Sequence, residues 1–151
     1  MISTATSLLS VLPPGSRDHL LTAARDVNFP AGERLFQEGS PADRFWIVRT
    51  GTVILDMAVP GRRPAAVDTL HPGDLVGWSW LIPPYTWHLG AETLSPVRAL
   101  EFDAPEVRRM CDADPELGRA VATRVAEITG HRLQQARARL LDLFAPHGAA
   151  P

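Results

Sequence analysis

Lysine is absent from this chain of 151 residues, and there is only one cysteine. The single cysteine, Cys111, excludes an internal disulfide, and a lone thiol without a metal-ligand pattern indicates a reducing compartment. No run approaches the roughly 18 consecutive apolar residues of a membrane span. Residues 1–13 also lack the charged start and the apolar stretch of a signal peptide. We therefore expect a cytoplasmic protein with no membrane partner.

The chain also lacks an excess of either charge. Its 15 basic and 17 acidic residues give a formal net charge of −2, which provides no broad field for nucleic acids or anionic membranes. Apolar residues make up 45% of the sequence, as in soluble globular proteins, and the length suits one hydrophobic core. We expect a single domain over residues 1–151.

Recognisable catalytic patterns are missing as well. Metal enzymes built on β-rolls usually carry two ligands on one strand in His-x-His or His-x-Asp/Glu spacing, whereas the five histidines here are scattered. There is no Gly-x-Ser-x-Gly nucleophile elbow. Cys111 lies in a predicted charged helix beside Arg108 and Arg109, without a positioned base. We predict that the chain is not an enzyme and holds no metal.

Two short apolar-periodic segments, residues 7–12 and 17–27, flank the Pro-Pro-Gly breaker at positions 13–15. They predict N-terminal helices within residues 5–27, with Ser16 as a cap of the second.

Residues 28–103 consist of short apolar runs separated by glycine and proline. This pattern predicts about eight antiparallel strands. Phe45–Arg49 and Thr52–Val59 predict a hairpin around Gly51, because apolar residues alternate along the second run. His71-Pro72-Gly73-Asp74 has the proline and glycine of a type II turn, and Val97–Asp103 resumes a strand. With no helix between most strands, a closed or double-sheet roll is favoured over βαβ units.

Residues 104–144 have a helical pattern. Asp103 and Glu106 have capping-box spacing, and Asp114-Pro115 predicts the start of a long helix. Its apolar stripe runs through Leu117, Val121, Val125 and Ile128 and continues less cleanly through Ala136, Leu140 and Leu143. The stripe either packs on the roll or forms a homodimer seam along residues 115–144.

Five arginines on the long helix alternate with acidic residues, which indicates a solvated face; they are Arg119, Arg124, Arg132, Arg137 and Arg139. Residues 145–151 read as a tail too short for a DNA-recognition module. We therefore expect no DNA partner.

The predicted fold is mainly β with flanking helices: an antiparallel, jelly-roll-like β-roll, or double-stranded β-helix, with N-terminal helices and a long C-terminal helix. Four local strings along this order resemble the strand and turn framework of the cyclic-nucleotide-binding domain family, the sensor domains of the catabolite activator type. The strings are Phe29-Pro30-Ala31-Gly32-Glu33, Phe36-Gln37-Glu38-Gly39, Arg44 to Val53, and Pro72-Gly73-Asp74-Leu75-Val76-Gly77. The resemblance covers about residues 5–144.

This resemblance implies a phosphate-binding cassette after Gly77, with a short helix whose N-terminal amides face a cyclic phosphate, an acidic residue for the ribose and an arginine for the phosphate. Trp78 stands in place of the acidic residue, and Trp87 and His88 stand where the arginine is expected, so the cassette is degenerate. An indole cannot replace a bidentate guanidinium contact. The resemblance places the ligand contacts at Gly77, Trp78, Ser79, Trp80, Trp87, His88, Ile128 and Arg132.

Two functions remain open. The first is a non-catalytic, small-molecule-binding regulatory module, in which a cyclic nucleotide or another small planar or anionic ligand changes how the long helix packs. The second is a ligand-free protein-interaction or scaffold module that uses the Trp-rich cassette or the long helix. In the second, the tryptophans fill a closed pocket and their polar groups find internal partners.

Overall fold

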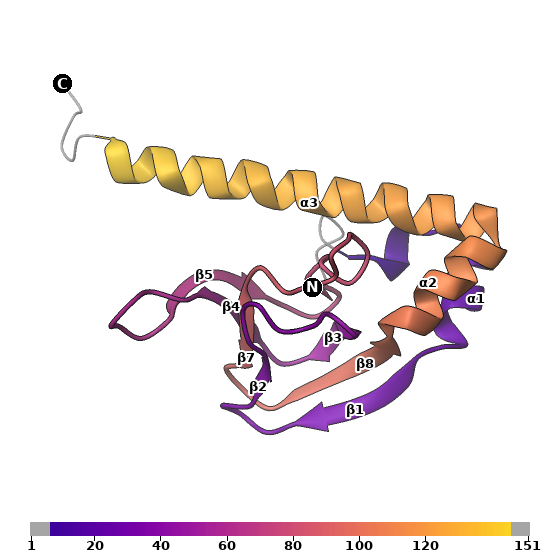
Figure 1. Ribbon diagram of the computed structural model, residues 1–151, viewed down its shortest axis with the longest axis horizontal. Coiled ribbons are helices and arrows are strands. Elements are labelled where there is room, and N and C mark those ends of the chain that lie inside the picture. The colour runs from indigo at the N-terminus through magenta and orange to yellow at the C-terminus, as the bar shows by residue number, and fades with distance from the viewer. Residues whose placement is uncertain (1–6, 146–151) are drawn as a thin grey trace.

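The computed structural model describes residues 7–145, which form a two-sheet roll with helices at both ends of the chain (Figure 1). Two residues of the predicted N-terminal helical region and most of the predicted tail therefore lie outside the described residues. The elements in chain order are η1 (Leu9–Val11), α1 (Pro14–Leu21), β1 (Arg25–Phe29), β2 (Arg34–Phe36), β3 (Arg44–Thr50), β4 (Val53–Met57), β5 (Ala65–Leu70), β6 (Leu75–Val76), β7 (Gly90–Thr93), β8 (Val97–Asp103), α2 (Ala104–Ala113) and α3 (Pro115–Phe144).

Two antiparallel sheets of four strands each make the roll. The strand orders are β1-β8-β3-β6 and β2-β7-β4-β5. Side chains from both sheets meet in one core, which includes Phe45, Leu55, Leu70 and Phe102. This packing of alternate residues from two facing sheets is the geometry of a β-sandwich or roll. The predicted antiparallel roll with flanking helices is confirmed.

The hairpin predicted around Gly51 is wrong. Strand β3 pairs with β6 and β8, whereas β4 pairs with β5 and β7, so the chain changes sheets at Gly51. Gly51 has a φ of 91°, and a Cβ there would lie 2.2 Å from the carbonyl oxygen of Pro96. A glycine is required at this position because the backbone passes close to Pro96, just before β8. It is not required by a turn between two paired strands.

The helical region at the N-terminus is shorter than predicted. Helix α1 ends at Leu21, and Arg25–Phe29 form strand β1, in register with residues 97–101 of β8. Long-range pairing with β8 therefore overrides the local helical pattern of residues 25–27. Ser16 is buried inside α1 and does not cap it.

The turn at residues 71–74 is confirmed, since the Asp74 N–H donates to the His71 carbonyl at 3.0 Å and Gly73 has a φ of 94°. A positive φ at the third position defines a type II turn. The predicted strand Val97–Asp103 is also confirmed as β8.

Both predicted caps of the C-terminal helices are present. Asp103 accepts the N–H of Glu106 at 2.9 Å, and Asp114 accepts the N–H of Leu117 at 3.2 Å. Figure 1 shows α3 running along one side of the roll from the end where α2 meets it, with its C-terminal half passing β4 and β5. The first half of its apolar stripe is buried, whereas Leu140 and Leu143 are 54% and 78% exposed. No helix within residues 7–145 has both the length and the apolar character needed to span a membrane.

The interpretation of the α3 arginines as a solvated face is wrong for Arg124 and Arg132, whereas Arg139 is 53% exposed even though it also contacts the roll. Arg124 is 8% exposed and donates to the Ser7 carbonyl at 2.7 Å. Arg132 donates to a β6 carbonyl, and Arg139 donates to one on β5. Because α3 lies against the roll, these long side chains reach backbone acceptors on β5, on β6 and in the segment before η1.

Candidate functional site

A cavity of about 870 Å³ lies between the roll and the C-terminal half of α3. Its roll side is formed by parts of β2, β4 and β5 together with residues 77–79 and 87–89. Its helix side is formed by residues between 129 and 143 of α3. Most of the lining side chains are apolar, and ligand pockets in proteins commonly have this character and a volume of roughly 300–1,000 Å³.

Trp87 packs directly on the backbone of Gly77. Gly77 has a φ of 82°, and a Cβ there would lie 2.4 Å from the six-membered ring of Trp87. The indole is 4% exposed and stacks on Phe36, with ring centroids 3.8 Å apart. The space directly against Gly77 is therefore filled by an aromatic ring.

Trp78 and His88 form a second aromatic pair at the cavity. Their rings stack with centroids 5.0 Å apart, and the His88 Nδ1 lies 3.1 Å from the Ser79 hydroxyl. Trp78 is half-buried and Ser79 is buried, whereas His88 is exposed. Together the stacked rings of Trp78 and His88 present a flat, partly accessible surface at the edge of the cavity.

Residues 78–81 form a hydrogen-bonded turn and not the short helix that the resemblance implied. The Leu81 N–H donates to the Trp78 carbonyl at 3.0 Å. Two prolines, Pro83 and Pro84, follow, and proline has no N–H to extend a helical hydrogen-bond pattern. An array of free helix N-terminal amides is therefore not available here.

Trp80 points into the core, away from the cavity. Its side chain is fully buried, stacks on Phe45 at 3.7 Å and donates its indole N–H to the Gly77 carbonyl at 3.1 Å. Ile128 on α3 is likewise in the core and 1% exposed. The structure thus separates these two expected ligand contacts from the cavity wall.

Arg132 is one of two arginines that α3 brings to the cavity, and the other is Arg139. The guanidinium of Arg132 donates to the Leu75 carbonyl at 2.5 Å, and its buried Nε has no hydrogen-bond partner among the described residues. Burial lowers the pKa of Arg132, although the charges of Asp74 and Asp68 act in the opposite direction. Arginine stays protonated in proteins, so a charged and incompletely satisfied donor lies at this position.

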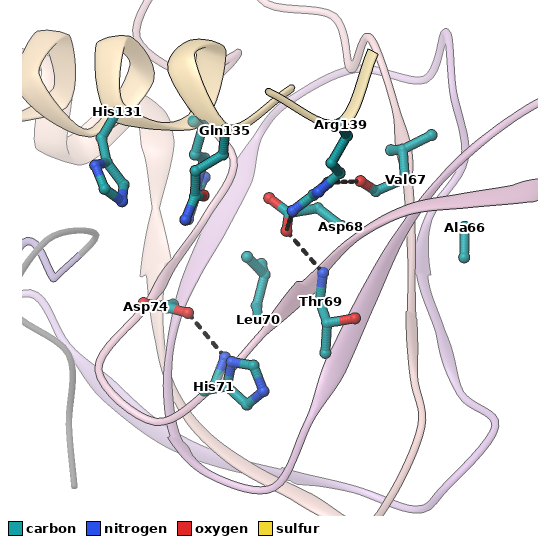
Figure 2. Close-up of a pocket in the computed structure, with 11 residues that line it drawn as sticks. Ala66, Val67, Asp68, Thr69, Leu70, His71, Asp74, His131, Gln135 and Arg139 are labelled. Carbon is teal, nitrogen blue, oxygen red and sulfur yellow. Dashed lines mark hydrogen bonds and ion pairs between the residues drawn. The ribbon is translucent and has the colours of Figure 1, made fainter. Parts of the chain in front are cut away.

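A second, smaller cavity of about 540 Å³ adjoins the first and shares Arg132 and Arg139 with it. Figure 2 shows His131 and Gln135 projecting from α3 toward β5 and the turn after it. Arg139 is tied to that strand through the Val67 carbonyl and through Asp68, whose carboxylate lies 3.1 Å away. The wall of this cavity is polar and its Arg139 charge is already paired.

Six of the eight expected contacts line the larger cavity: Gly77, Trp78, Ser79, Trp87, His88 and Arg132. Sequence reasoning did not assign the floor contributed by Phe36, Leu55 and Met57, because the wrong hairpin gave no partner for that face of β4. It did place Leu140 and Leu143 on the helix stripe, and these side chains extend the cavity along α3.

Among residues 7–145, no group of three or more histidine, cysteine, aspartate or glutamate side chains is arranged to hold a metal ion. Cys111 is half-buried, and burial together with Asp112 and Asp114 raises the pKa of its thiol. A raised pKa leaves less thiolate, which is the reactive form.

Comparison with known proteins gives a consistent assignment. A family model described as the cyclic nucleotide-binding domain matches residues 26–114. The CRP-like cAMP-activated global transcriptional regulator of Mycobacterium tuberculosis is 27% identical over 131 residues, which are 87% of this chain and 57% of that protein. The cAMP-dependent protein kinase regulatory subunit of Dictyostelium discoideum is 30% identical over 108 residues, which are 70% of this chain and 33% of that protein.

The fold is shared with a solved cyclic nucleotide-binding domain from Methylobacillus flagellatus. The TM-score is 0.79 at 17% identity, covering 93% of this chain and 79% of that one. The chain spans only a third to somewhat over half of the length of the two curated relatives named above.

Proposed function

The chain belongs to the cyclic nucleotide-binding domain family, and we propose that it is a non-catalytic regulatory module that senses a small ligand between the roll and α3. A regulatory role is supported by the two curated relatives, a cAMP-activated transcriptional regulator and a kinase regulatory subunit. The observation that carries the proposal is the cavity of about 870 Å³, which has one wall on the roll and the other on α3.

A ligand in this cavity contacts both parts of the molecule at once. The first half of α3 is fixed by buried side chains from Leu117 to Ile128, whereas the second half has few buried apolar contacts. The second half is therefore the part of the helix that a ligand can most easily reposition or order. The size of that effect is limited by the difference in ligand affinity between the two arrangements.

Ordinary cyclic nucleotides are poor candidates for the ligand. Trp78 follows Gly77 in place of an acidic residue, and the Trp87 indole packs where an anion would approach the Gly77 backbone. The amide-lined helix start that could bind a phosphate without side chains is replaced by a turn. We propose weak or absent binding of cyclic AMP and cyclic GMP.

Titration calorimetry and tryptophan fluorescence with cyclic AMP, cyclic GMP and a metabolite panel test the proposal, with amide hydrogen exchange of α3 as the readout of coupling. A ligand should slow exchange in residues 129–144 and change the fluorescence of the cavity tryptophans. Trp78→Phe should remove part of the fluorescence change while calorimetric binding persists. Silence across the panel, or binding that leaves α3 exchange unchanged, would count against a sensing role.

A protein-interaction role has a specific observation in its favour. The last turns of α3 carry exposed apolar side chains, of which Leu141, Leu143 and Phe144 are each at least 70% exposed. Contiguous exposed apolar surface commonly marks an interface. Trp80 and Trp87 are buried, which favours the helix over the cassette as the docking surface. A homodimer seam along α3 is the form of this interface that we propose.

Light scattering coupled to gel filtration tests the seam. Leu141 is exposed and does not line the cavity, so Leu141→Glu should shift a dimer toward monomer without altering the ligand site. Arg98→Glu, at an exposed position on β8 and not on α3, is the control. A wild-type chain that is monomeric at high micromolar concentration would exclude the homodimer.

A further inference from the structure

The wall of the larger cavity has the chemistry of an apolar-ligand site. Phe36 and Trp87 form a stacked pair at its floor, and Leu133 and Leu140 face it from α3. A sugar or a phosphate would leave polar groups against this surface without hydrogen-bond partners, which is costly in a buried site. A flat hydrocarbon or aromatic body, in contrast, gains from burial and from offset stacking on indole rings.

One unpaired charge interrupts this apolar wall. Arg132 makes no salt bridge within residues 7–145, and its buried Nε has no partner there. The neighbouring carboxylates are engaged elsewhere: Asp68 pairs with Arg139 at 3.1 Å, and Asp74 accepts the backbone N–H of His71 at 2.8 Å. Each buried donor left without an acceptor costs free energy, so a ligand that supplies an anionic acceptor removes that cost.

The other titratable side chains at the cavity do not compete for this role. Arg139 is already paired with Asp68, so the two contribute no net charge. His88 is exposed and contacts Ser79 and Trp78. Arg132 is therefore the charge at the cavity without an ion pair among residues 7–145, and it lies on α3 and not on the roll.

From this combination we propose that the cavity takes an amphipathic monoanion, an aromatic carboxylic acid, whose carboxylate pairs with Arg132 and whose ring packs among Trp78, Trp87 and α3. This inference rests on the proposed sensing function and specifies its ligand class. Carboxylate and guanidinium form short charge-assisted bonds, often bidentate, and Arg132 has donors beyond the one held by Leu75. Anion recognition is thereby moved from the cassette to the helix that would transmit the signal.

The test uses three probes of known chemistry: 2-naphthoate, the neutral 2-naphthamide of the same shape, and cyclic AMP. Calorimetry on the full chain should give binding of 2-naphthoate at least tenfold tighter than binding of 2-naphthamide. Arg132→Gln should remove that preference, because it keeps a donor for the Leu75 carbonyl and loses the charge. Arg132→Lys should keep part of the preference, and it also serves as the test if Arg132→Gln does not fold by circular dichroism.

Arg137→Gln is the matched control, since Arg137 is an exposed arginine on the same helix, and it should leave both affinities unchanged. Equal affinity for acid and amide, or an acid preference that survives Arg132→Gln, would overturn the inference. So would tight cyclic AMP binding with no binding of 2-naphthoate, although the sensing function would then survive. Binding of 2-naphthoate through Arg132 without any change in α3 hydrogen exchange would have the opposite meaning: the ligand class stands and the sensing function fails.

Discussion

The guanidinium of Arg108 on α2 lies 3.9 Å from the centre of the Tyr85 ring and donates to the carbonyl of Trp80 at 2.6 Å. Tyr85 has a φ of 57°, an unfavourable value for a residue with a Cβ. One side chain of α2 thus holds both ends of the loop that follows the cassette turn. Through this contact, the loop beside the larger cavity is tied to the helix that precedes α3.

Arg108→Met should loosen this loop and destabilise the protein. A hydrogen bond that involves a charged donor contributes about 2 kcal/mol, and the cation–π contact adds about 0.5–1 kcal/mol. The free energy of unfolding from urea titration should fall by about 2.5–3 kcal/mol, and amide exchange should accelerate in residues 80–86. Arg109→Met is the control, since Arg109 is exposed. Equal losses in the two variants would contradict a specific role for Arg108.

Gly77→Ala should displace Trp87, because the new Cβ would lie 2.4 Å from the indole ring. Gly61→Ala is the control, because it has the cost of a positive φ without the steric clash. Gly61 has a similar φ of 71° but nothing within 4 Å of its Cβ position. Gly77→Ala should therefore cost about 1–3 kcal/mol more in unfolding free energy than Gly61→Ala, the usual range for overpacking. Adding Trp87→Leu should recover part of that difference. No recovery would show that the indole is not the source.

Local patterns were enough to predict the elements whose ends are encoded in side chains. Asp103 and Asp114 cap α2 and α3 where their spacing to the following helical N–H groups predicted. Gly73 marks its turn because only a residue without a Cβ takes its positive φ cheaply. Strand β8 was also predicted, because its apolar run lies between Pro96 and Asp103, the cap of the following helix.

Local sequence patterns could not predict the features that depend on long-range contacts. Gly51 looks like a hairpin glycine, but its requirement comes from Pro96, which is distant in sequence and adjacent in space. Residues 25–27 continue a helical periodicity until pairing with β8 overrides it. At the site, the tryptophans were found from composition, but nothing local distinguishes the fully buried Trp80 from Trp78 at the cavity edge.

The ion pair between Arg34 and Asp56 should be important for stability. Arg34 bonds both carboxylate oxygens of Asp56, at 2.9 and 2.8 Å, and Asp56 is 8% exposed. Asp56 raises the pKa of Arg34 through these hydrogen bonds. Arg34→Met leaves a nearly buried carboxylate unpaired, so the free energy of unfolding should fall by about 3 kcal/mol.

Arg49→Met is the matched control for that variant. Arg49 and Asp26 are 3.8 Å apart and more than half exposed, and exposed pairs contribute about 0–1 kcal/mol. The double variant Arg34→Met/Asp56→Leu should regain part of the lost stability, because no buried charge is left unpaired; Glu92, the other partner of Arg34 at 3.3 Å, is 46% exposed. A loss in Arg34→Met no larger than in Arg49→Met would mean that the buried pair is inconsequential.

Stability should depend on acid pH through Asp114, which caps α3 and lies 2.9 Å from His19 Nδ1. The backbone N–H of Leu117 lowers the pKa of Asp114 most, and the hydrogen bond to His19 lowers it further. Because the folded pKa lies below the unfolded one, the carboxylate stabilises the fold fully above the unfolded value of about 3.9. That contribution is lost as the pH falls through the lower, folded value.

Thermal melts of the wild type, Asp114→Ala and Asp114→Asn at several pH values should show this loss of stabilisation in acid. At pH 7 the alanine variant should melt lowest, because it loses both the cap and the charge, and the asparagine variant should lie between because it keeps a capping oxygen. The gap between wild type and asparagine should narrow as the pH falls from about 5 toward the folded pKa, since both side chains are then neutral. Asp112→Ala, at an exposed neighbouring position, should show no such convergence. A gap that stays constant, or widens in acid, would mean that the ionised form of Asp114 does not stabilise the start of α3.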